Sequence, residues 1–296
     1  MEIVLAQLFV GLSVGSILLL IALGLTFTFG QMNVINMAHG EFIMAGAYTT
    51  YVLQQVMGDR LTGLSFMVSL PLAFLIAGAM GVVLERLLIR RFYGRPLDTL
   101  LVTWGVSLML QQLARQIFGA PNVEVRAPSW LSGGFTVGGV SLSSARLFIL
   151  ALVVLAVGVI WFYMTRLRPG RSMRAVMQNR QLASCSGIRT HGVDRATFFI
   201  GSGLAGVAGV GLTLLGSIGP TLGSNYIVDA FLVVVVGGLG QLRGAVLAAF
   251  GLGVLNSFVE YGTQASFAKV VVFVAIVAFL QARPQGLVVL RTRSLS

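Results

Sequence analysis

"IVLAQLFVGLSVGSILLLIALGLTFTF" occupies residues 3–29 and contains no charged residue. As an α-helix, this segment would extend roughly 40 Å, which exceeds the roughly 30 Å hydrocarbon layer of a bilayer. The chain of 296 residues is 56% hydrophobic and 10% charged, whereas a soluble globular protein carries about 25% charged residues. The sequence therefore predicts a membrane protein.

Further apolar segments of similar character follow along the whole chain. They occupy residues 42–57, 62–84, 97–118, 145–164, 197–218, 227–239, 244–261 and 266–282. Two of them, 42–57 and 227–239, are short, and each lies beside a polar or glycine-rich break, a pattern that marks transport paths. We therefore predict an all-α, polytopic helical bundle of about eight or nine transmembrane helices, some of them short or broken, forming one domain over residues 1–296.

Arginine clusters indicate how the chain is oriented. Residues 85–95, residues 166–195 and the C-terminal tail, which includes Arg291 and Arg293, hold most of the basic residues. Positive loops remain in the cytoplasm, so these three segments, including the C-terminus, are expected on the cytoplasmic side. Residues 119–144 then form an external loop, in which alternating apolar residues predict a short hairpin. The net charge of +11 lies in short loops, which argues against nucleic-acid binding.

Residues 166–195 are long enough to form structure of their own. We expect one helix from about Ser172 to Ser184, with Met173, Val176 and Met177 on one side and arginines elsewhere. An amphipathic helix between two spanning helices either lies on the lipid surface or docks a partner protein.

Several kinds of chemistry lack their sequence signatures. The chain has no glycine-rich phosphate loop followed by lysine, and no nucleophile elbow. Its two histidines, His39 and His191, are far apart, and neither has a metal-ligand partner three or four residues away. We therefore expect neither an enzyme nor a metal or cofactor site.

Polar residues interrupt the apolar pattern at "NVINMAHGEF", residues 33–42. If residues 33–44 are helical, Asn33, Asn36 and Gly40 share one face, with His39 beside Asn36. Glu41 has three open explanations: it is hydrated at the cytoplasmic end of a helix, it pairs with a distant arginine, or burial keeps it neutral.

A second polar group opens the short segment 227–239. Asn225 and Asp229 lie near its beginning, where an acidic residue is also an ordinary helix-start residue. In a membrane span, a buried ionisable residue is a functional candidate because burial is costly.

Four stretches resemble the permease subunits of branched-chain amino acid and urea-type ABC importers. They are "GLTFTFGQMNVINMAHGEFIMAGAY" (24–48), "GRSMRAVMQNRQLASCSGI" (170–188), "SNYIVDAF" (224–231) with "VVVVGGLGQLRGAVLAAFGLG" (233–253), and "QARPQGL" (281–287). The resemblance covers nearly the whole chain in one order. Within the family, "FGQMNVINMAHGEF" and "QNRQLA" followed by "GIRT" are most similar to the urea branch. One departure is "RTHGVDR" (189–195), which is longer than expected before the next helix.

The resemblance implies a multi-pass permease of the bacterial inner membrane, in partnership with other proteins. These are a second, similar permease subunit, two cytoplasmic ATPase subunits and a periplasmic substrate-binding protein. It also implies that residues 166–195 are the coupling segment that docks on an ATPase. The residues expected there are Gly170, Arg174, Gln178, Asn179, Gly187 and Ile188.

The expected translocation path contains the polar residues of both breaks. These are Asn33, Asn36, His39, Glu41, Asn225 and Asp229. The expected function is ATP-driven uptake of a small polar solute, with urea as the main prediction and leucine, isoleucine or valine as the alternative. A passive urea or water channel and a proton-coupled carrier using His39 and Glu41 also remain open.

Overall fold

The computed structural model describes residues 2–137 and 140–288, and these residues are predominantly α-helical. The helices are α1 (Glu2–Met32), α2 (His39–Met57), α3 (Thr62–Leu87), α4 (Pro96–Phe118), α5 (Ser144–Arg166), α6 (Arg168–Gln178), α7 (Arg180–Cys185), α8 (Thr190–Leu212), α9 (Leu222–Gly237), α10 (Leu242–Gly262) and α11 (Ala265–Ala282). Single 3₁₀ turns occur at Asp59–Leu61, Ile89–Phe92 and Ser129–Leu131. This architecture confirms the predicted polytopic helical bundle.

Five helices are long and apolar enough to cross a membrane by length and composition: α1, α3, α5, α8 and α10. Shorter apolar helices include α9 and the segment Phe267–Ala282 of α11. The arginines Arg291 and Arg293, used above to place the C-terminus, lie outside the described residues.

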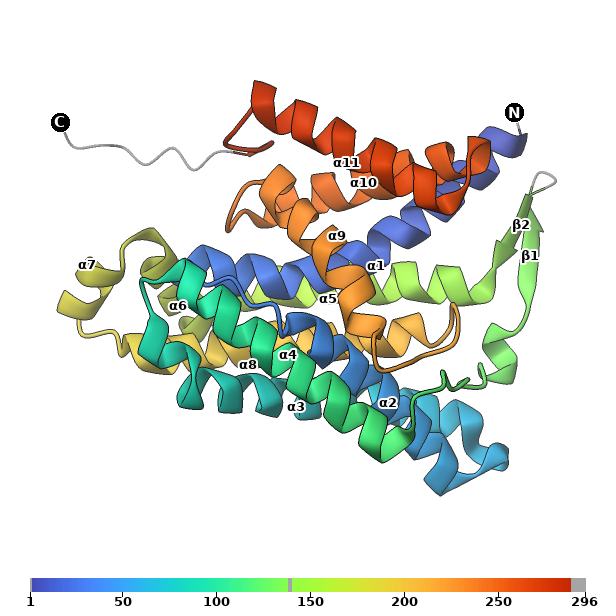
Figure 1. Ribbon diagram of the computed structural model, residues 1–296, viewed down its shortest axis with the longest axis horizontal. Helices are drawn as coiled ribbons and strands as arrows, with labels where there is room; N and C mark the ends of the chain where they lie inside the picture. Colours follow the sequence, from blue (N-terminus) through green and yellow to red (C-terminus); the bar gives the residue numbers. More distant parts are fainter. Residues whose placement is uncertain (1, 138–139, 289–296) are drawn as a thin grey trace.

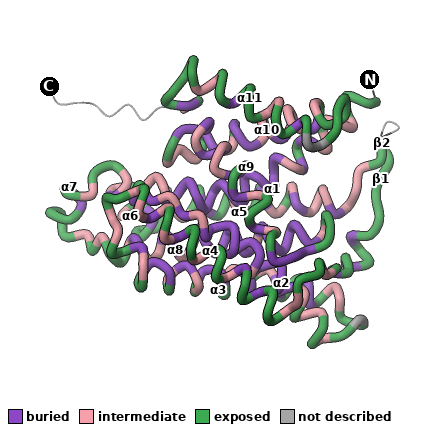
Figure 2. The backbone as a smooth tube through the Cα atoms, viewed as in Figure 1, coloured by how far each residue is buried: buried purple, intermediate pink, exposed green. Residues whose placement is uncertain are grey.

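Helices α1 and α8 form the buried centre of the bundle (Figures 1 and 2). Glycines on α8 allow its close approach to neighbouring helices. A Cβ added at Gly206 would lie 2.5 Å from the carbonyl oxygen of Ala73 in α3. A Cβ added at Gly209 would lie 2.0 Å from the carbonyl oxygen of Ile43 in α2. The small residues of "GSGLAGVAGVG" (201–211) therefore serve packing, as small residues do in lipid. Helix α5 is peripheral, because less than a quarter of the residues in its most apolar part are buried.

The two long connections lie at opposite ends of the molecule (Figure 1). One contains the antiparallel hairpin β1 (Gly134–Val137) and β2 (Val140–Ser143), in which Phe135 pairs with Leu142. This confirms the hairpin predicted for residues 119–144. The other contains α6 and α7. We call the first of these ends the hairpin end and the second the α7 end.

The segment between α5 and α8 differs from the single helix expected. Helix α6 ends at Gln178, and Asn179 adopts an extended conformation (φ −156°). The Asn179 side chain then accepts a hydrogen bond from the backbone N–H of Leu182 and caps α7. The prediction of one helix from Ser172 to Ser184 was wrong because an asparagine, a strong helix-start residue, begins a second helix there. Helix α8 begins at Thr190, so the "RTHGVDR" stretch is largely helical.

Candidate functional site

The polar break after α1 places the start of α2 deep within the bundle. Helix α1 stops at Met32, and Asn33 has a positive φ of 53°, which asparagine tolerates better than most residues. Residues 33–38 are not helical. His39, the first residue of α2, lies with its Nε2 3.2 Å from the carbonyl oxygen of Ile21. Because Ile21 precedes the end of α1 by three turns, the chain returns about 16 Å along α1 before α2 begins.

This geometry corrects the helical face expected for residues 33–44. Asn33 is exposed and terminates α1, whereas Asn36 and His39 are buried. Within the described part of the chain, the Asn36 amide and the Nδ1 atom of His39 have no hydrogen-bond partner. A break rather than a continuous helix therefore brings Asn36 and His39 into the interior and leaves Asn33 outside.

Glu41 lies in a cluster of polar side chains from three helices. Its side chain is 1% exposed, and its Oε1 atom accepts hydrogen bonds from Ser107 Oγ (2.7 Å) and Gln111 Nε2 (2.9 Å) of α4. Gln111 Nε2 also lies 2.8 Å from Ser224 Oγ of α9. We name Glu41, Ser107, Gln111 and Ser224 the Glu41 cluster. The other carboxyl oxygen, Oε2, is buried and has no hydrogen-bond partner among the residues that the structure describes.

Two of the three explanations for Glu41 are wrong in this structure. The residue is not at a hydrated helix end, because it is fully buried beside α4 and α9. It does not pair with a distant arginine, because the described residues contain no ion pair to Glu41. The third explanation remains: the Glu41 carboxyl group is buried, and its hydrogen-bond donors, Ser107 and Gln111, are uncharged.

The starts of α2 and α9 meet beside the Glu41 cluster. A Cβ added at Gly40 would lie 2.7 Å from the Gly223 carbonyl oxygen, and one at Gly223 would lie 2.1 Å from that of Gly40. Only glycines allow this backbone contact. The starts of these two short helices thus come from opposite halves of the sequence and adjoin inside the protein, as in transporters with discontinuous helices.

An apolar cluster covers the Glu41 cluster on the side of the α2 C-terminus. Met44 and Tyr48 of α2 pack with Ala114 of α4, Val125 and Ile218. The ring of Tyr48 stacks on Phe118 with 4.1 Å between centroids. Backbone hydrogen bonds between Val123 and Ile218 join the two loops that contribute to this cover. The Glu41 cluster is therefore closed on this side in the present conformation.

The remaining predicted path residues are less buried. Helix α9 begins at Leu222, five residues before the predicted segment, so Asn225 lies in its first turn and is exposed. Asp229 is half-buried, and Lys269 Nζ of α11 lies 4.0 Å from its Oδ2 atom. The structure brings Asn36, His39 and Glu41 into the interior of the bundle, but not Asn33 or Asn225.

Helix α4 supplies polar contacts that sequence reasoning missed. Its buried side chains are Thr99, Thr103, Ser107, Gln111 and Ala114. Thr103 also accepts a hydrogen bond from the Met37 backbone N–H (3.0 Å) in the break. The signal was present in the sequence as hydroxyl and amide residues at every fourth position, which place these polar side chains on one face of the helix.

A second polar network lies at the α7 end. Arg180 of α7 donates two hydrogen bonds to the fully buried Asp194 of α8, with Nη1 3.0 Å from Oδ1. Gln31, one residue before the end of α1, donates to the same Oδ1 atom (2.8 Å) and accepts from Thr197. The hydrogen bond to Asp194 raises the pKa of Arg180, which therefore stays charged. Through Asp194 of α8, the network joins α7 to the end of α1.

Sequence reasoning also missed this network. Asp194 is the sole acidic residue in the arginine-rich segment 166–195, which was a usable signal. Arg180 further lies 5.3 Å from the ring centroid of Tyr93, whose hydroxyl donates to Glu85 Oε1 at 2.8 Å. The segment between α5 and α8 therefore contacts α3 and its following turn as well.

The predicted coupling residues fall into two groups. Arg174, Gln178, Asn179 and Gly187 are exposed, and Ile188 is half-buried. Gly187 (φ +82°) ends α7, where its N–H donates to Ser184 and that of Ile188 donates to Ala183, the Schellman arrangement. Gly170 is buried, and a Cβ there would lie 2.1 Å from the Tyr163 carbonyl oxygen. Gly170 therefore permits α6 to pack on α5 and is not a surface contact.

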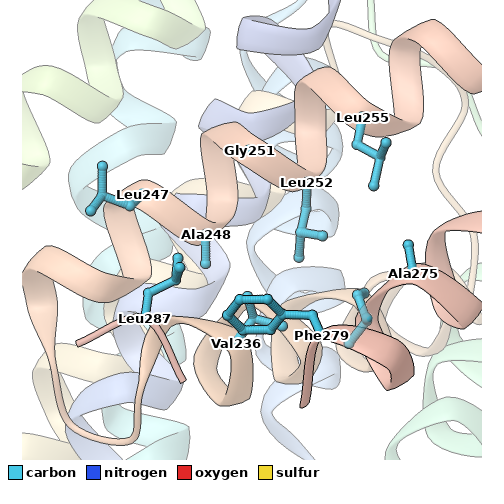
Figure 3. Close-up of a pocket in the computed structure, with 10 residues that line it drawn as sticks. Val236, Leu247, Ala248, Gly251, Leu252, Leu255, Ala275, Phe279 and Leu287 are labelled. Atoms are coloured by element: carbon cyan, nitrogen blue, oxygen red, sulfur yellow. The ribbon is translucent and has the colours of Figure 1, made fainter. Parts of the chain in front are cut away.

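A groove between α10 and α11 offers no polar group to a solute. It is lined by aliphatic residues and Phe279 (Figure 3). Such a lining cannot orient a polar molecule, so this groove is not a candidate for the transport site.

Comparison with known proteins identifies a family to which the chain is similar over most of its length. Residues 7–280 match the model of a family described as the permease component of the branched-chain amino acid transport system. The chain belongs to this permease family. This permease is 32% identical to the high-affinity branched-chain amino acid transport system permease protein BraD of Pseudomonas aeruginosa, over 96% of this chain and 95% of that protein. No solved structure matches the chain.

Two further relatives show the range of similarity. The permease is 31% identical to LivH of Escherichia coli K12, described in the same terms as BraD, over 96% of this chain and 94% of that protein. It is 25% identical to the ribose import permease protein RbsC of the same organism, over 78% and 72% of the two chains. These relatives confirm a multi-pass membrane transport component rather than an enzyme, and favour the branched-chain amino acid alternative over the predicted urea branch.

Proposed function

We propose that this chain is the membrane subunit of an ATP-driven importer that carries branched-chain amino acids into the cytoplasm. The observation that carries the proposal is the Glu41 cluster, a polar site inside the bundle where the starts of α2 and α9 meet. A membrane protein rarely buries a carboxyl group without a functional reason, because the burial is costly. The named relatives BraD and LivH support the choice of solute.

The proposed path leads from the hairpin end, past the apolar cover, to Glu41 and the break at residues 33–38. We place the hairpin end outside and the α7 end in the cytoplasm, because the arginine-rich segments 85–95 and 166–195 belong to the α7 end. The whole chain acts as one permease domain, and its tail lies in the cytoplasm.

The proposed coupling segment is α6 and α7. Met173 and Val176 bury one side of α6 against the bundle, while Arg171 and Arg174 remain exposed. Leu182 of α7, the helix that follows, is an exposed apolar side chain (65%). An exposed mixture of arginine and leucine suits docking of a protein partner, here a cytoplasmic ATPase subunit. A second permease subunit, a second ATPase and a periplasmic binding protein complete the proposed assembly.

Uptake by the purified assembly in proteoliposomes tests this proposal. Labelled leucine should accumulate only when ATP and the ATPase subunits are present, whereas labelled urea should not. Replacing Arg174 by glutamate should lower ATP-dependent uptake at least about tenfold, because opposite charge then faces the docking surface. The control is Arg115→Glu at the other end of the bundle, on the last turn of α4. Uptake that continues without an ATPase would show a passive channel instead.

A further inference from the structure

The two oxygens of the Glu41 carboxyl group have different surroundings. Both hydrogen-bond donors, from Ser107 and Gln111, approach Oε1, and Oε2 has none although it is buried. As a carboxylate, Oε2 lacks a donor; as a protonated carboxyl group, its hydroxyl lacks an acceptor. Neither protonation state satisfies this atom, and an unsatisfied buried polar atom is destabilising by about 1–3 kcal/mol.

Ser107 and Gln111 hold the carboxyl group in one orientation. Gln111 is itself positioned by Ser107 (3.1 Å) and by Ser224 (2.8 Å). The three supporting residues carry no charge, so the described residues around Glu41 provide hydrogen bonds but no positive charge. In the carboxylate form of Glu41, a group that binds at Oε2 must be a hydrogen-bond donor, and the best donor to a buried carboxylate is a cation.

We propose that Glu41 binds the ammonium group of the transported amino acid at Oε2, with Ser107, Gln111 and Ser224 as positioning residues. This inference rests on the proposed function and adds the chemical group by which the membrane subunit holds its solute. A second nearby feature suits the rest of such a molecule. The Asn36 amide, which has no partner, lines a narrow pocket with Leu25, Ile227 and Phe231.

That pocket is closed in the present conformation. It has room for about one water molecule (≈10 Å³). The apolar cover around Tyr48 closes the Glu41 cluster on the side of the α2 C-terminus, and the backbones of Gly40 and Gly223 are in contact beside it. Binding at Oε2 therefore requires the starts of α2 and α9 to separate at the contact between Gly40 and Gly223, as the alternating access of a transporter requires.

The decisive variant is Glu41→Gln, which keeps the size of the side chain and an oxygen that accepts from Ser107 and Gln111. A purely structural role predicts uptake close to that of the unmodified importer. Binding of an ammonium group predicts a loss of at least about tenfold in kcat/KM for labelled leucine, because a charge-assisted hydrogen bond is removed. Glu260→Gln, the same change on the exposed face of α10, is the control. Leucine uptake by Glu41→Gln within twofold of the unmodified importer would overturn the proposal.

Carbodiimide labelling of the unmodified importer provides a second measurement that needs no variant. Dicyclohexylcarbodiimide modifies carboxyl groups in apolar surroundings, and mass spectrometry locates the product. Leucine should protect Glu41, whereas 4-methylpentanoate, which lacks the amine, should not. Glu85 is an internal control, since it is equally buried and also has one unpartnered oxygen. Equal protection by both compounds, or none, would overturn the ammonium site, while ATP-dependent leucine uptake in the same preparation would leave the proposed function intact.

Discussion

The ion pair between Arg180 and Asp194 yields an asymmetric prediction for stability. Asp194 is fully buried, whereas the Arg180 side chain is 35% exposed. In Arg180→Ala, the carboxylate remains buried with Gln31 as its main donor, since His191 is 3.9 Å away and half exposed. Removing one partner of a buried pair costs about 3–5 kcal/mol. We expect about 3 kcal/mol here, because Gln31 remains.

The reverse replacement should cost less. In Asp194→Asn, Arg180 loses its partner but can turn towards water, because it is already a third exposed. Solvent screening reduces the loss, and we expect about 1–2 kcal/mol. The double variant contains neither charge, so its cost should fall about 2 kcal/mol below the sum of the single costs.

Equilibrium unfolding by sodium dodecyl sulfate in mixed micelles measures these costs. Arg174→Ala, which removes an exposed arginine from α6, is the control and should lie within about 0.5 kcal/mol of the unmodified chain. Additive costs for the two single variants, or a larger cost for Asp194→Asn than for Arg180→Ala, would refute the reasoning.

Three further predictions concern packing, titration and a helix end. Gly46→Ala should destabilise the bundle by about 1–3 kcal/mol, because the added Cβ would lie 2.0 Å from the Gly206 carbonyl oxygen. The control is Gly105→Ala, which has open space around it and should be neutral or stabilising in the same unfolding assay. Burial, with the nearby carboxylates of Asp194 and Glu85, raises the pKa of Tyr93 above the ordinary value of a tyrosine, so the unfolded chain releases this proton first. Stability should therefore fall above about pH 10, and Tyr93→Phe should flatten this slope; an unchanged slope would contradict it. Gly187→Ala should lower the free energy of unfolding by about 1 kcal/mol, because alanine is strained at the positive φ that ends α7. A melting curve equal to that of the unmodified chain would disprove this prediction.

Much of the architecture followed from the sequence. Uncharged apolar runs require helices in a bilayer, because each helix satisfies its own backbone hydrogen bonds. The breaks at residues 33–42 and 237–244 were visible as polar and glycine-rich interruptions, and both lie at helix ends in the structure. The hairpin in residues 119–144 was predicted from alternation. The failure at Asn179 was local: the same residue type suits a helix interior poorly and a helix start well.

The candidate site depended on tertiary structure. The sequence singled out Glu41 as a carboxyl group without a nearby cation, but Ser107, Gln111 and Ser224 lie 66 or more residues away from it along the chain. Only the packing of α2, α4 and α9 brings them together, and among the described residues this packing leaves Glu41 without an arginine partner. Composition and periodicity determined that the chain spans a membrane, because they set the free energy of each segment in lipid. Which polar groups meet inside it was decided by how the glycine contacts align the helices, because that alignment sets the distances between side chains far apart in sequence.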